Sequence, residues 1–559
     1  MKSAKATMPV IKWINNVIGK NSKWIATLTF IQVCQGVFGV VFALVLKSVI
    51  DTAVKGDKSR LVAEILILGA LAAISITLQA LGKIVDEKAR VNLDKAFRQK
   101  AFSELLNRSY GEVMDTHSGE WMNRIVSDTN VVVSAAIQIV PNVVGTVVRL
   151  LGAMVVLAVL LPNFVLLLIP AGAIIAVVSR VFRKKLKVYH KQAQNADGKV
   201  RSFMQERLSS LIVVKSFTQE NQTEKISEEY MDDLGKIRMK RIHFVNLCTI
   251  ALHIAMRGAY VLGVAVCTIN IVNGLMSYGT MMAVLQLVTQ VETPFAQISG
   301  FLPQYYSMIA SAERLMEIEL LEKDINNHQL SEDGIKEFYE KEFSAVGLEK
   351  AYFSYKDAGD GKTHVLDNKS VEIKKGEYVA FVGESGCGKS TAMKLMMCLY
   401  PLDKGGRYVK TKNDELIALT SDYRGLFAYV PQGNFLVSGT IREILTFSNE
   451  KLMANDEALQ KALKIACADA FVNELPKGID TELGELGSGL SEGQTQRLAI
   501  ARAIMSERPI LMLDEATSAL DSATEEKVIN NIRTMTDRTV IIITHRPAAL
   551  TVCDKKIQF

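Results

Sequence analysis

The sequence predicts an α-helical membrane domain with six spans, followed by an α/β domain. The chain of 559 residues is 49% hydrophobic, with a mean hydropathy of +0.17, although 22% of its residues are charged. Such a mixture is typical of a protein with one part in lipid and one in water. Nearly all long apolar runs lie before residue 310, whereas strand-like and helical runs alternate after residue 344. We therefore expect a membrane domain over residues 1–320, a charged and polar linker over 321–343 and an α/β domain over 344–559.

Composition excludes several classes of protein. The apolar content excludes a disordered chain, and the net charge of +6 gives no support to a nucleic-acid partner. The seven cysteines are scattered and include no C-x-x-C pair, so neither a disulfide framework nor a zinc site is indicated.

Six apolar runs are long enough to cross a bilayer, which takes about 20 residues. Beyond Ile84 and Phe182 the sequence turns polar but keeps helical periodicity, which predicts membrane helices that project far into the cytoplasm. The six runs are Trp24–Ile50, Leu61–Ile84, Ile137–Leu161, Phe164–Phe182, Phe244–Val272 and Thr280–Ile298.

Basic residues predict how these spans are oriented. Lysines precede the first run, and basic clusters at 180–187 and 236–241 flank the fourth and fifth runs, whereas the turns at 162–163 and 270–279 carry no charge. Because Lys and Arg concentrate on the cytoplasmic side, both termini and the α/β domain are expected in the cytoplasm, on a multi-pass protein of the cell membrane. The first run is too long for a secretory signal peptide and is expected to remain as an anchor.

A glycine-rich segment, GESGCGKST, predicts a phosphate-binding P-loop. It follows the apolar strand Tyr378–Val382 and precedes the helical run Ala392–Leu399, which is the context that a P-loop requires. Its glycines let backbone N–H groups turn toward phosphate oxygens, Lys389 reaches the β- and γ-phosphates, and Ser390 can bind Mg²⁺. The nucleotide-binding residues expected here are Gly383, Glu384, Ser385, Gly386, Cys387, Gly388, Lys389, Ser390 and Thr391.

Two later strands end in residues suited to phosphoryl chemistry. The run Ile510–Leu513 ends in Asp514 and Glu515, which we expect to hold Mg²⁺ and to deprotonate an attacking water. An Asp-Glu pair alone is as often a helix cap, and the P-loop upstream favours catalysis. The strand Val540–Thr544 ends in His545, where a γ-phosphate sensor would lie.

Further motifs resemble those of ATP-binding cassette (ABC) half-transporters of the bacterial exporter fold. LSEGQTQRLAIARAI, which starts at Leu490, looks like the ABC signature that other P-loop ATPases lack, and VPQGNFLVSGTIREIL resembles a Q-loop with Gln432. Thr481–Gly487 looks like the exporter X-loop, Ser518–Asp521 like the D-loop, and Tyr355 matches the aromatic residue that stacks on adenine.

This resemblance implies a dimer of two such chains that binds ATP and Mg²⁺. Each ATP would be held by Tyr355 and the P-loop of one chain and covered by Ser491, Gly493 and Gln494 of the other. The implied metal ligands are Ser390, Gln432 and Asp514, and the implied catalytic residues are Glu515, His545 and Gln432. Segments His117–Thr129 and Leu211–Phe217 resemble parts of the loops that dock on the cassettes.

Three features depart from the family pattern. Glu492 stands in the signature where Gly is usual, and we expect its carboxylate to point away from the phosphates that it would repel. Leu486 replaces the Arg common in the X-loop. The chain ends soon after Asp554, and we interpret this end as a trimmed tail rather than a functional truncation.

Polar residues inside the spans are candidates for substrate contact. Gln286, Gln290, Thr293 and Gln297 fall within an arc of about 60° on one helical face, and this stripe either lines a translocation pathway or joins helices through hydrogen bonds. Glu292 lies off the stripe, so we expect it to pair with Arg149 or Arg257 rather than to bind substrate.

The predicted function is ATP-driven export of a small molecule, lipid or peptide by alternating access. An importer built on the exporter fold and a regulatory ABC protein that only binds ATP remain alternatives, although Glu515 and His545 argue against the second. The transported substrate stays unidentified, and either a homodimer or a heterodimer is compatible with the sequence.

Overall fold

The computed structural model divides into two compact units. The helical unit comprises Met1–Ser103 and Gly119–Glu319, and the α/β unit comprises Glu104–Ser118 and Leu320–Phe559. The structure describes residues 2–324, 330–356, 362–433, 435–484, 487–544 and 546–559, with backbone alone at 2–8, 163–184, 187, 252–253, 255–256, 259, 292–300, 302 and 548.

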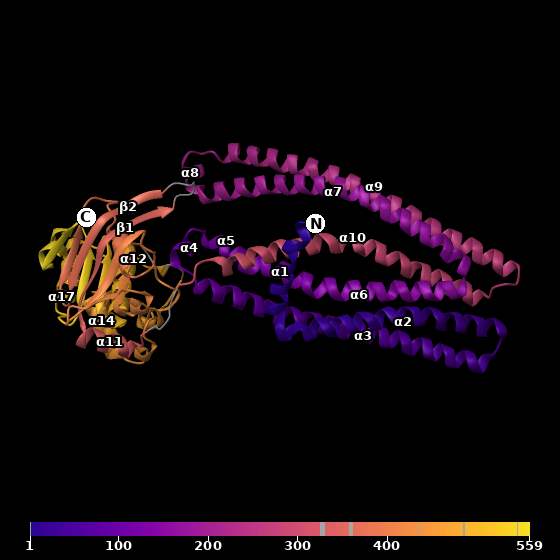
Figure 1. Ribbon diagram of the computed structural model, residues 1–559, viewed down its shortest axis with the longest axis horizontal. Helices are drawn as coiled ribbons and strands as arrows, with labels where there is room; N and C mark the ends of the chain where they lie inside the picture. The colour runs from indigo at the N-terminus through magenta and orange to yellow at the C-terminus, as the bar shows by residue number, and fades with distance from the viewer. Residues whose placement is uncertain (1, 325–329, 357–361, 434, 485–486, 545) are drawn as a thin grey trace. The chain divides into compact units, whose positions relative to one another are not determined.

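Long helices build the helical unit (Figure 1). A short 3₁₀ turn, η1 (Gly19–Asn21), separates the first two helices, and a π-helical turn, η2 (Arg124–Asp128), separates α5 from α6. The helices are α1 (Lys2–Ile18), α2 (Ser22–Lys55), α3 (Lys58–Leu106), α5 (Ser118–Asn123), α6 (Thr129–Leu160), α7 (Pro162–Ser209), α8 (Leu211–Ser216), α9 (Glu220–Val272) and α10 (Tyr278–Leu320).

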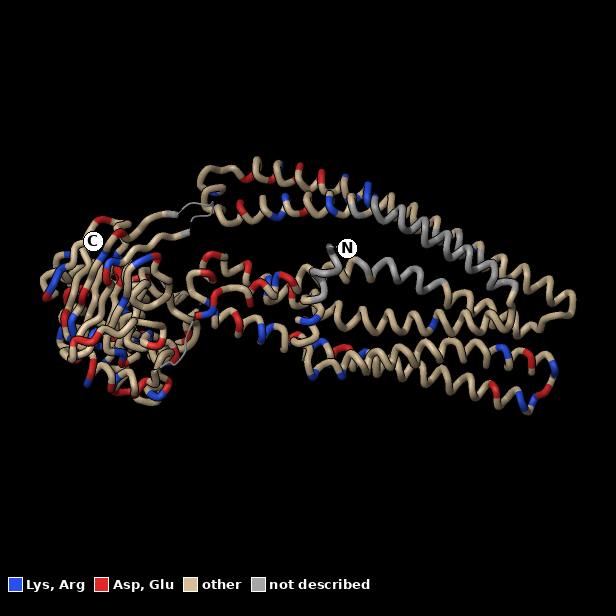
Figure 2. The backbone as a smooth tube through the Cα atoms, in the orientation of Figure 1, with Lys and Arg blue, Asp and Glu red and all other residues tan. Residues whose placement is uncertain are grey.

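Three stretches of helix are long and apolar enough to cross a membrane among the residues whose side chains are described. They are Pro9–Lys55, Lys58–Leu106 and Ser118–Leu160; they contain the first two predicted spans and all of the third except Leu161. The other three predicted spans fall on α7, α9 and α10, where many side chains lie outside the description. In Figure 2 the described parts of the long helices are mostly tan, while Lys, Arg, Asp and Glu gather at the turn between α2 and α3 and at the opposite ends of the helices.

Small residues let α2 and α6 approach closely. A Cβ on Gly36 would lie 3.2 Å from the carbonyl oxygen of Gly145, and a Cβ on Gly145 would lie 2.8 Å from the Cβ of Gln32. Such stripes of small residues are how helices pack in lipid, where no hydrophobic effect drives them together. Next to this crossing, buried residues of α2, α6, α9 and α10 form a core that includes Ala43, Leu157 and Leu287.

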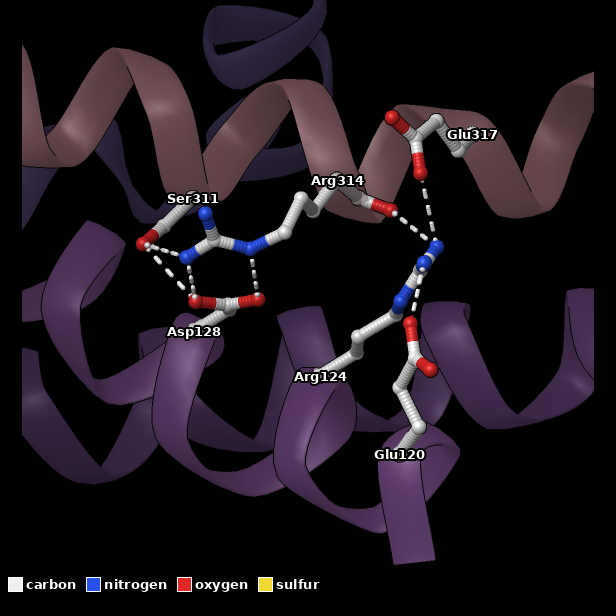
Figure 3. Close-up of polar contacts among 6 residues, drawn as sticks. All are labelled: Glu120, Arg124, Asp128, Ser311, Arg314 and Glu317. Carbon is white, nitrogen blue, oxygen red and sulfur yellow. Dashed lines mark hydrogen bonds and ion pairs between the residues drawn. The ribbon is translucent and has the colours of Figure 1, made fainter. Parts of the chain in front are cut away.

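Two ion-pair clusters tie the turn η2 to the distal part of α10 (Figure 3). The buried carboxylate of Asp128 accepts two hydrogen bonds from Arg314, at 2.8 and 2.5 Å, and a third from Ser311 at 2.8 Å. Beside it, Arg124 bonds Glu317 at 2.8 Å and Glu120 at 2.6 Å. These charged side chains lie beyond the apolar part of α10, so water can solvate those that are exposed.

The α/β unit is built on a parallel five-stranded sheet of order β11-β3-β10-β9-β6. An antiparallel sheet, β2-β1-β4-β5, and a two-stranded pair, β7-β8, complete its strands. The strands are β1 (Phe343–Lys356), β2 (Lys362–Lys374), β3 (Tyr378–Val382), β4 (Lys404–Thr411), β5 (Leu416–Ala418), β6 (Phe427–Val430), β7 (Gly439–Thr440), β8 (Glu482–Leu483), β9 (Ile510–Asp514), β10 (Thr539–Ile543) and β11 (Lys555–Gln558). The helices are α4 (Tyr110–Met114), α11 (Glu332–Lys341), α12 (Lys389–Met396), α13 (Ile441–Thr446), α14 (Asp456–Ile465), α15 (Asp469–Glu474), α16 (Glu492–Met505), α17 (Ser522–Arg533) and α18 (Pro547–Val552), with 3₁₀ turns η3 (Ser421–Leu426), η4 (Glu450–Leu452) and η5 (Gly478–Asp480).

Both faces of the parallel sheet are buried. Along β9, Leu511 and Leu513 belong to one core, whereas Ile510 and Met512 belong to the core on the opposite face. This alternation follows from the period of two in a strand, and burial on both sides explains why β9 and β10 read as continuous apolar runs.

Helix α11 occupies the second half of the stretch expected as a linker. Its buried residues Ile335, Phe338 and Tyr339 join the core below the antiparallel sheet, and the hydroxyl of Tyr339 lies 2.8 Å from that of Thr539. The α/β unit therefore packs residues that precede the expected boundary at 344. The stretch reads as polar because these three apolar residues, spaced as one helix face, stand among charged ones.

The short segment Glu104–Ser118, which we call the docking segment, packs within the α/β unit. Its Arg108 donates a hydrogen bond to the carbonyl oxygen of Leu321 at 2.7 Å, and the backbone N–H of Asp324 donates to Asn107 at 3.0 Å. Asp324 in turn accepts two bonds from Arg424, at 2.7 and 3.1 Å, and Arg424 also donates to the carbonyls of Met397 and Cys398 just after α12. One guanidinium thus joins the chain leaving α10 to the end of α12.

Candidate nucleotide-binding site

The carboxyl ends of the parallel strands gather the candidate site. β3, β10, β9 and β6 are hydrogen-bonded in parallel register, so their C-terminal ends meet at one edge of the sheet. The P-loop follows β3, Asp514 and Glu515 stand at the end of β9, and Gln432 follows β6. His545 follows β10 but lies outside the described residues.

Backbone geometry explains the glycines of the P-loop. Gly383, Gly386 and Gly388 have φ angles of 147°, 84° and 97°, a region that side chains disfavour. At Gly388 space is also limiting, since a Cβ would lie 2.7 Å from Leu366. Glu384 and Ser385 are exposed on the rim of the loop.

The buried Lys389 opens α12 and turns its ammonium into the loop. Its Nζ donates to the carbonyl oxygens of Gly383 at 2.9 Å and Glu384 at 2.8 Å, and it lies 3.7 Å from the sulfur of Cys387. This ammonium and the free N–H groups at the start of α12 converge on one loop, which is the donor arrangement that a nucleotide's phosphates require. The loop therefore fits ATP.

A hydroxyl and a carboxylate meet beside the P-loop. Ser390 donates to Asp514 Oδ1 at 2.7 Å, and the hydroxyl of Tyr429 donates to Asp514 Oδ2 at 2.8 Å. Hydroxyl and carboxylate oxygens are ligands that Mg²⁺ prefers, so Ser390 and the buried Asp514 fit this ion. Burial, together with the neighbouring Asp514 carboxylate, raises the pKa of Tyr429, which therefore stays a neutral donor.

Gln432 and Glu515 are in direct contact. The amide Nε2 of Gln432 donates to Glu515 Oε2 at 2.6 Å. Glu515 has a φ of 50°, a strained value for a residue with a side chain, and its N–H is held by the carbonyl oxygen of Ile543 at 3.1 Å. Strand β10 thus fixes the bend that turns this carboxylate out of β9.

The signature residues lie at the start of α16. Ser491 caps this helix. Its hydroxyl accepts a hydrogen bond from the backbone N–H of Gln494 at 3.3 Å, and the side chain of Gln494 accepts one from the backbone N–H of Ser491 at 2.9 Å. A Cβ on Gly493 would lie 3.0 Å from the carbonyl oxygen of Ala519, so glycine permits close packing against the D-loop. Glu492 is solvent-exposed in the first turn, where a carboxylate favours the helix dipole. Leu486 lies outside the described residues.

Three residues that sequence reasoning missed hold the D-loop. Gln496 accepts from the N–H of Ala519 at 3.0 Å and donates to Ser518 at 3.1 Å. Arg546 donates to the carbonyl oxygens of Ser518 and Leu520, both at 2.6 Å, and pairs at 3.1 Å with the buried Glu525. Two of them had a signal in the sequence, since Gln496 lies within the signature segment and the charged Arg546 directly follows His545.

Tyr355 lies in an aromatic cluster next to the P-loop helix. Its hydroxyl is 3.2 Å from that of Thr391, and its ring packs edge to face on Phe353 and Tyr400, with centroids 4.8 and 5.4 Å apart. The structure thus brings together the P-loop, Tyr355, Asp514, Glu515 and Gln432, while the signature residues Ser491 and Gln494 bond each other in a separate cap.

Comparison with known proteins decides the family. The model of the ABC transporter transmembrane region matches residues 25–295, and that of the ABC transporter domain matches residues 366–518. An ATP-dependent lipid A-core flippase of Dechloromonas aromatica is 30% identical over 542 residues, which cover 94% of this chain and 88% of the flippase. The chain belongs to the ABC transporter family.

Other relatives agree on this assignment. A multidrug resistance ABC transporter ATP-binding and permease protein of Lactococcus lactis subsp. lactis is 28% identical, with 90% of this chain and 82% of that protein covered. A bacterial Atm1-family ABC exporter solved with ATP bound has the same fold, with a TM-score of 0.79, 22% identity and coverage of 98% of this chain and 94% of that one. The protein is thus a multi-pass membrane protein of the ABC exporter type, whose α/β unit is an ATP-binding cassette, and the family generally works as a dimer.

Proposed function

We propose that this ABC transporter exports an amphipathic molecule across the cell membrane, driven by ATP hydrolysis between the cassettes of two chains. The observation that carries this proposal is the juxtaposition of Ser390, Asp514, Gln432 and Glu515 beside the P-loop. A protein that only bound ATP would not need a carboxylate held in a strained bend next to an amide. The names of the relatives, a lipid A-core flippase and a multidrug resistance protein, agree with an amphipathic substrate.

In this proposal each residue acts on charge or position. Lys389 exchanges its bonds with the loop carbonyls for bonds with phosphate oxygens. Ser390, Asp514 and Gln432 would hold Mg²⁺, which supplies neutralisation of phosphate charge. Glu515 accepts the proton of the attacking water, Gln432 orients that carboxylate, and His545 contacts the γ-phosphate.

The exposed signature residues would act on a partner chain. Ser491 and Gly493, at the N-terminus of α16, would close over ATP held by the second cassette, with Gln494 fixing the cap. Glu492 would stay in solvent. Closing and reopening would reach the membrane helices through the docking segment and switch them between inward-facing and outward-facing states.

The first test replaces Glu515 by Gln in the full-length transporter reconstituted in lipid. Hydrolysis should fall at least about a hundredfold while the affinity for ATP is retained, because only proton transfer is removed. Glu526→Gln, which makes the same change at an exposed site of α17, is the control and should keep full activity. Unchanged hydrolysis in E515Q would contradict the assignment.

A second test addresses direction. In proteoliposomes supplied with external ATP, only transporters whose cassettes lie on the outside of the vesicle can hydrolyse ATP. A fluorescent phosphatidylglycerol should then move from the outer to the inner leaflet, and E515Q should not move it. Movement in the opposite direction would indicate an importer.

A further inference from the structure

An open cavity of about 400 Å³ lies in the helical unit and is lined by residues of α2, α3, α6 and α10. Its wall combines polar groups with apolar side chains that include Phe38, Phe42 and Ile76. The polar residues that line it are Gln35, Ser75, Gln79, Arg149, Gln286 and Gln290.

The cavity lies between predicted membrane spans. Arg149 is at the centre of the predicted span Ile137–Leu161, and Gln286 and Gln290 are in the first third of α10. A guanidinium in hydrocarbon is costly unless it faces a cavity or an acceptor, and Arg149 does line a cavity.

Within the described part of the chain, two groups that line this cavity have unused hydrogen-bonding capacity. Among the side chains that the structure describes, none accepts a bond from Arg149, whose guanidinium offers five N–H donors. The Oε1 of Gln290 is buried without a donor, while its Nε2 donates to the carbonyl oxygen of Gly39 at 2.7 Å. A ligand with an anionic group and a hydroxyl or amine would complement both.

The cavity amides do not serve mainly to join helices. Of the four glutamines that line it, only Gln290 makes an interhelical hydrogen bond among the described contacts. Glu292 is the acidic residue that the sequence offers as an ion-pair partner of Arg149, but its side chain lies outside the described residues. Two residues beyond Gln290, it falls about 200° around the helix, away from the face that carries Gln286 and Gln290.

We propose that this cavity binds an amphipathic anion, with a phosphate or carboxylate head on Arg149 and a hydrocarbon part against Phe38, Phe42 and Ile76. The inference deepens the proposed export function by naming the chemistry of its substrate. Arginine suits such a head because its planar donors pair with two oxygens at once.

Binding without turnover tests this proposal. Labelled dodecyl phosphate and dodecanoate are titrated by equilibrium dialysis against the full-length protein in a neutral maltoside detergent. The wild type should bind one molecule per chain, and the tighter of the two probes identifies the head group. Arg149→Gln should weaken binding at least tenfold, and Arg149→Lys, which keeps the charge but cannot pair with two oxygens at once, should weaken it less.

The matched control is Arg257→Gln, which removes the same charge from an exposed position on α9 and should change binding less than twofold. Ser75→Phe, which fills the cavity without altering any charge, should weaken binding at least tenfold. Binding of a fluorescent ATP analogue verifies that each variant is folded.

Three results would overturn the proposal: unchanged binding in both R149Q and S75F, equal losses in R149Q and R257Q, or an R149Q protein that folds only when Glu292→Gln is added. The last would show that Glu292 neutralises Arg149. Because the assay needs no hydrolysis, its failure would leave the export proposal, which E515Q tests, unaffected.

Discussion

The ring of Tyr110 meets the ring of Tyr400 edge to face, with centroids 5.6 Å apart and planes at 89°. On its other side Tyr400 packs edge to face on Tyr355 at 5.4 Å. The docking segment, which connects α3 with α5, is thus one ring away from the residue expected to stack on adenine. If Tyr355 stacks on adenine, a change in its position would be passed through Tyr400 to the docking segment.

Replacing Tyr400 by Leu should therefore affect both nucleotide binding and coupling. Edge-to-face pairs contribute about 0.5–1.5 kcal/mol each beyond their buried area, so we expect the KM for ATP to rise about threefold to tenfold. Stimulation of hydrolysis by a transported compound should also decline. Tyr400→Phe keeps both ring contacts and should remain within twofold of the wild type in an ATPase assay. Equal KM values in Y400L and Y400F would contradict the aromatic route.

Replacing Asp128 by Asn should destabilise the helical unit. The buried carboxylate accepts three hydrogen bonds from Arg314 and Ser311, and bonds to charged groups contribute about 1.5–3 kcal/mol each. We expect the midpoint of thermal unfolding to fall by several degrees, followed through the fluorescence of the nearby buried Trp121. Glu317→Gln breaks an ion pair whose carboxylate is 53% exposed and should shift the midpoint far less.

Replacing Arg546 by Lys should slow turnover without weakening ATP binding. A lysine has one ammonium and cannot reach Ser518, Leu520 and Glu525 together, so the D-loop loses part of its support. We expect kcat to fall about tenfold while the Kd for a fluorescent ATP analogue is unchanged. Arg533→Lys, at the surface end of α17, should leave kcat within twofold. A matching loss in both variants would point to a general effect of removing guanidinium groups.

The pair Arg533–Asp554 predicts a pH dependence of stability. The guanidinium donates two hydrogen bonds to Asp554, at 3.0 and 2.6 Å, and holds the pKa of that carboxyl below its usual 3.8. Because the folded state binds fewer protons, the pair stabilises fully above that pH and loses its contribution as pH falls through the lower folded value. Both side chains are about two-fifths exposed, so the contribution is below about 1 kcal/mol.

Calorimetry of the full chain in detergent checks this dependence. Asp554→Asn should be slightly less stable than the wild type at pH 7, and the difference should shrink below pH 3.8. A difference that stays constant down to pH 3 would show that the ion pair is not its source.

The sequence predicted best what is local in the chain. The P-loop, the strand ends at Asp514 and Glu515, and the spans on α2 and α6 each depend on neighbouring residues whose spacing is dictated by one element. The assignment of the chain to a family followed from its motifs and was confirmed by the comparisons. The roles of the site residues remain predictions.

Contacts between distant segments were not predictable in this way. The packing of α11 into the core, the bond from Tyr429 to Asp514 and the ring pair of Tyr110 with Tyr400 join residues far apart in sequence. The spacing of the apolar residues of α11 is typical of an amphipathic helix but does not say which core it joins, and the other two contacts have no characteristic spacing, because tertiary packing decides them. The glutamine stripe was identified as a face, yet only the structure associated it with Arg149 around a cavity.

Arg424 connects the chain that follows α10 with the C-terminal end of α12. It donates hydrogen bonds to the carboxylate of Asp324, shortly after α10 ends, and to the carbonyl oxygens of Met397 and Cys398, which directly follow α12. A displacement of the chain that follows α10 would therefore be passed to α12 through this one planar group, as well as along the chain between them. If α10 moves during transport, we expect the helix that follows the predicted P-loop to move with it.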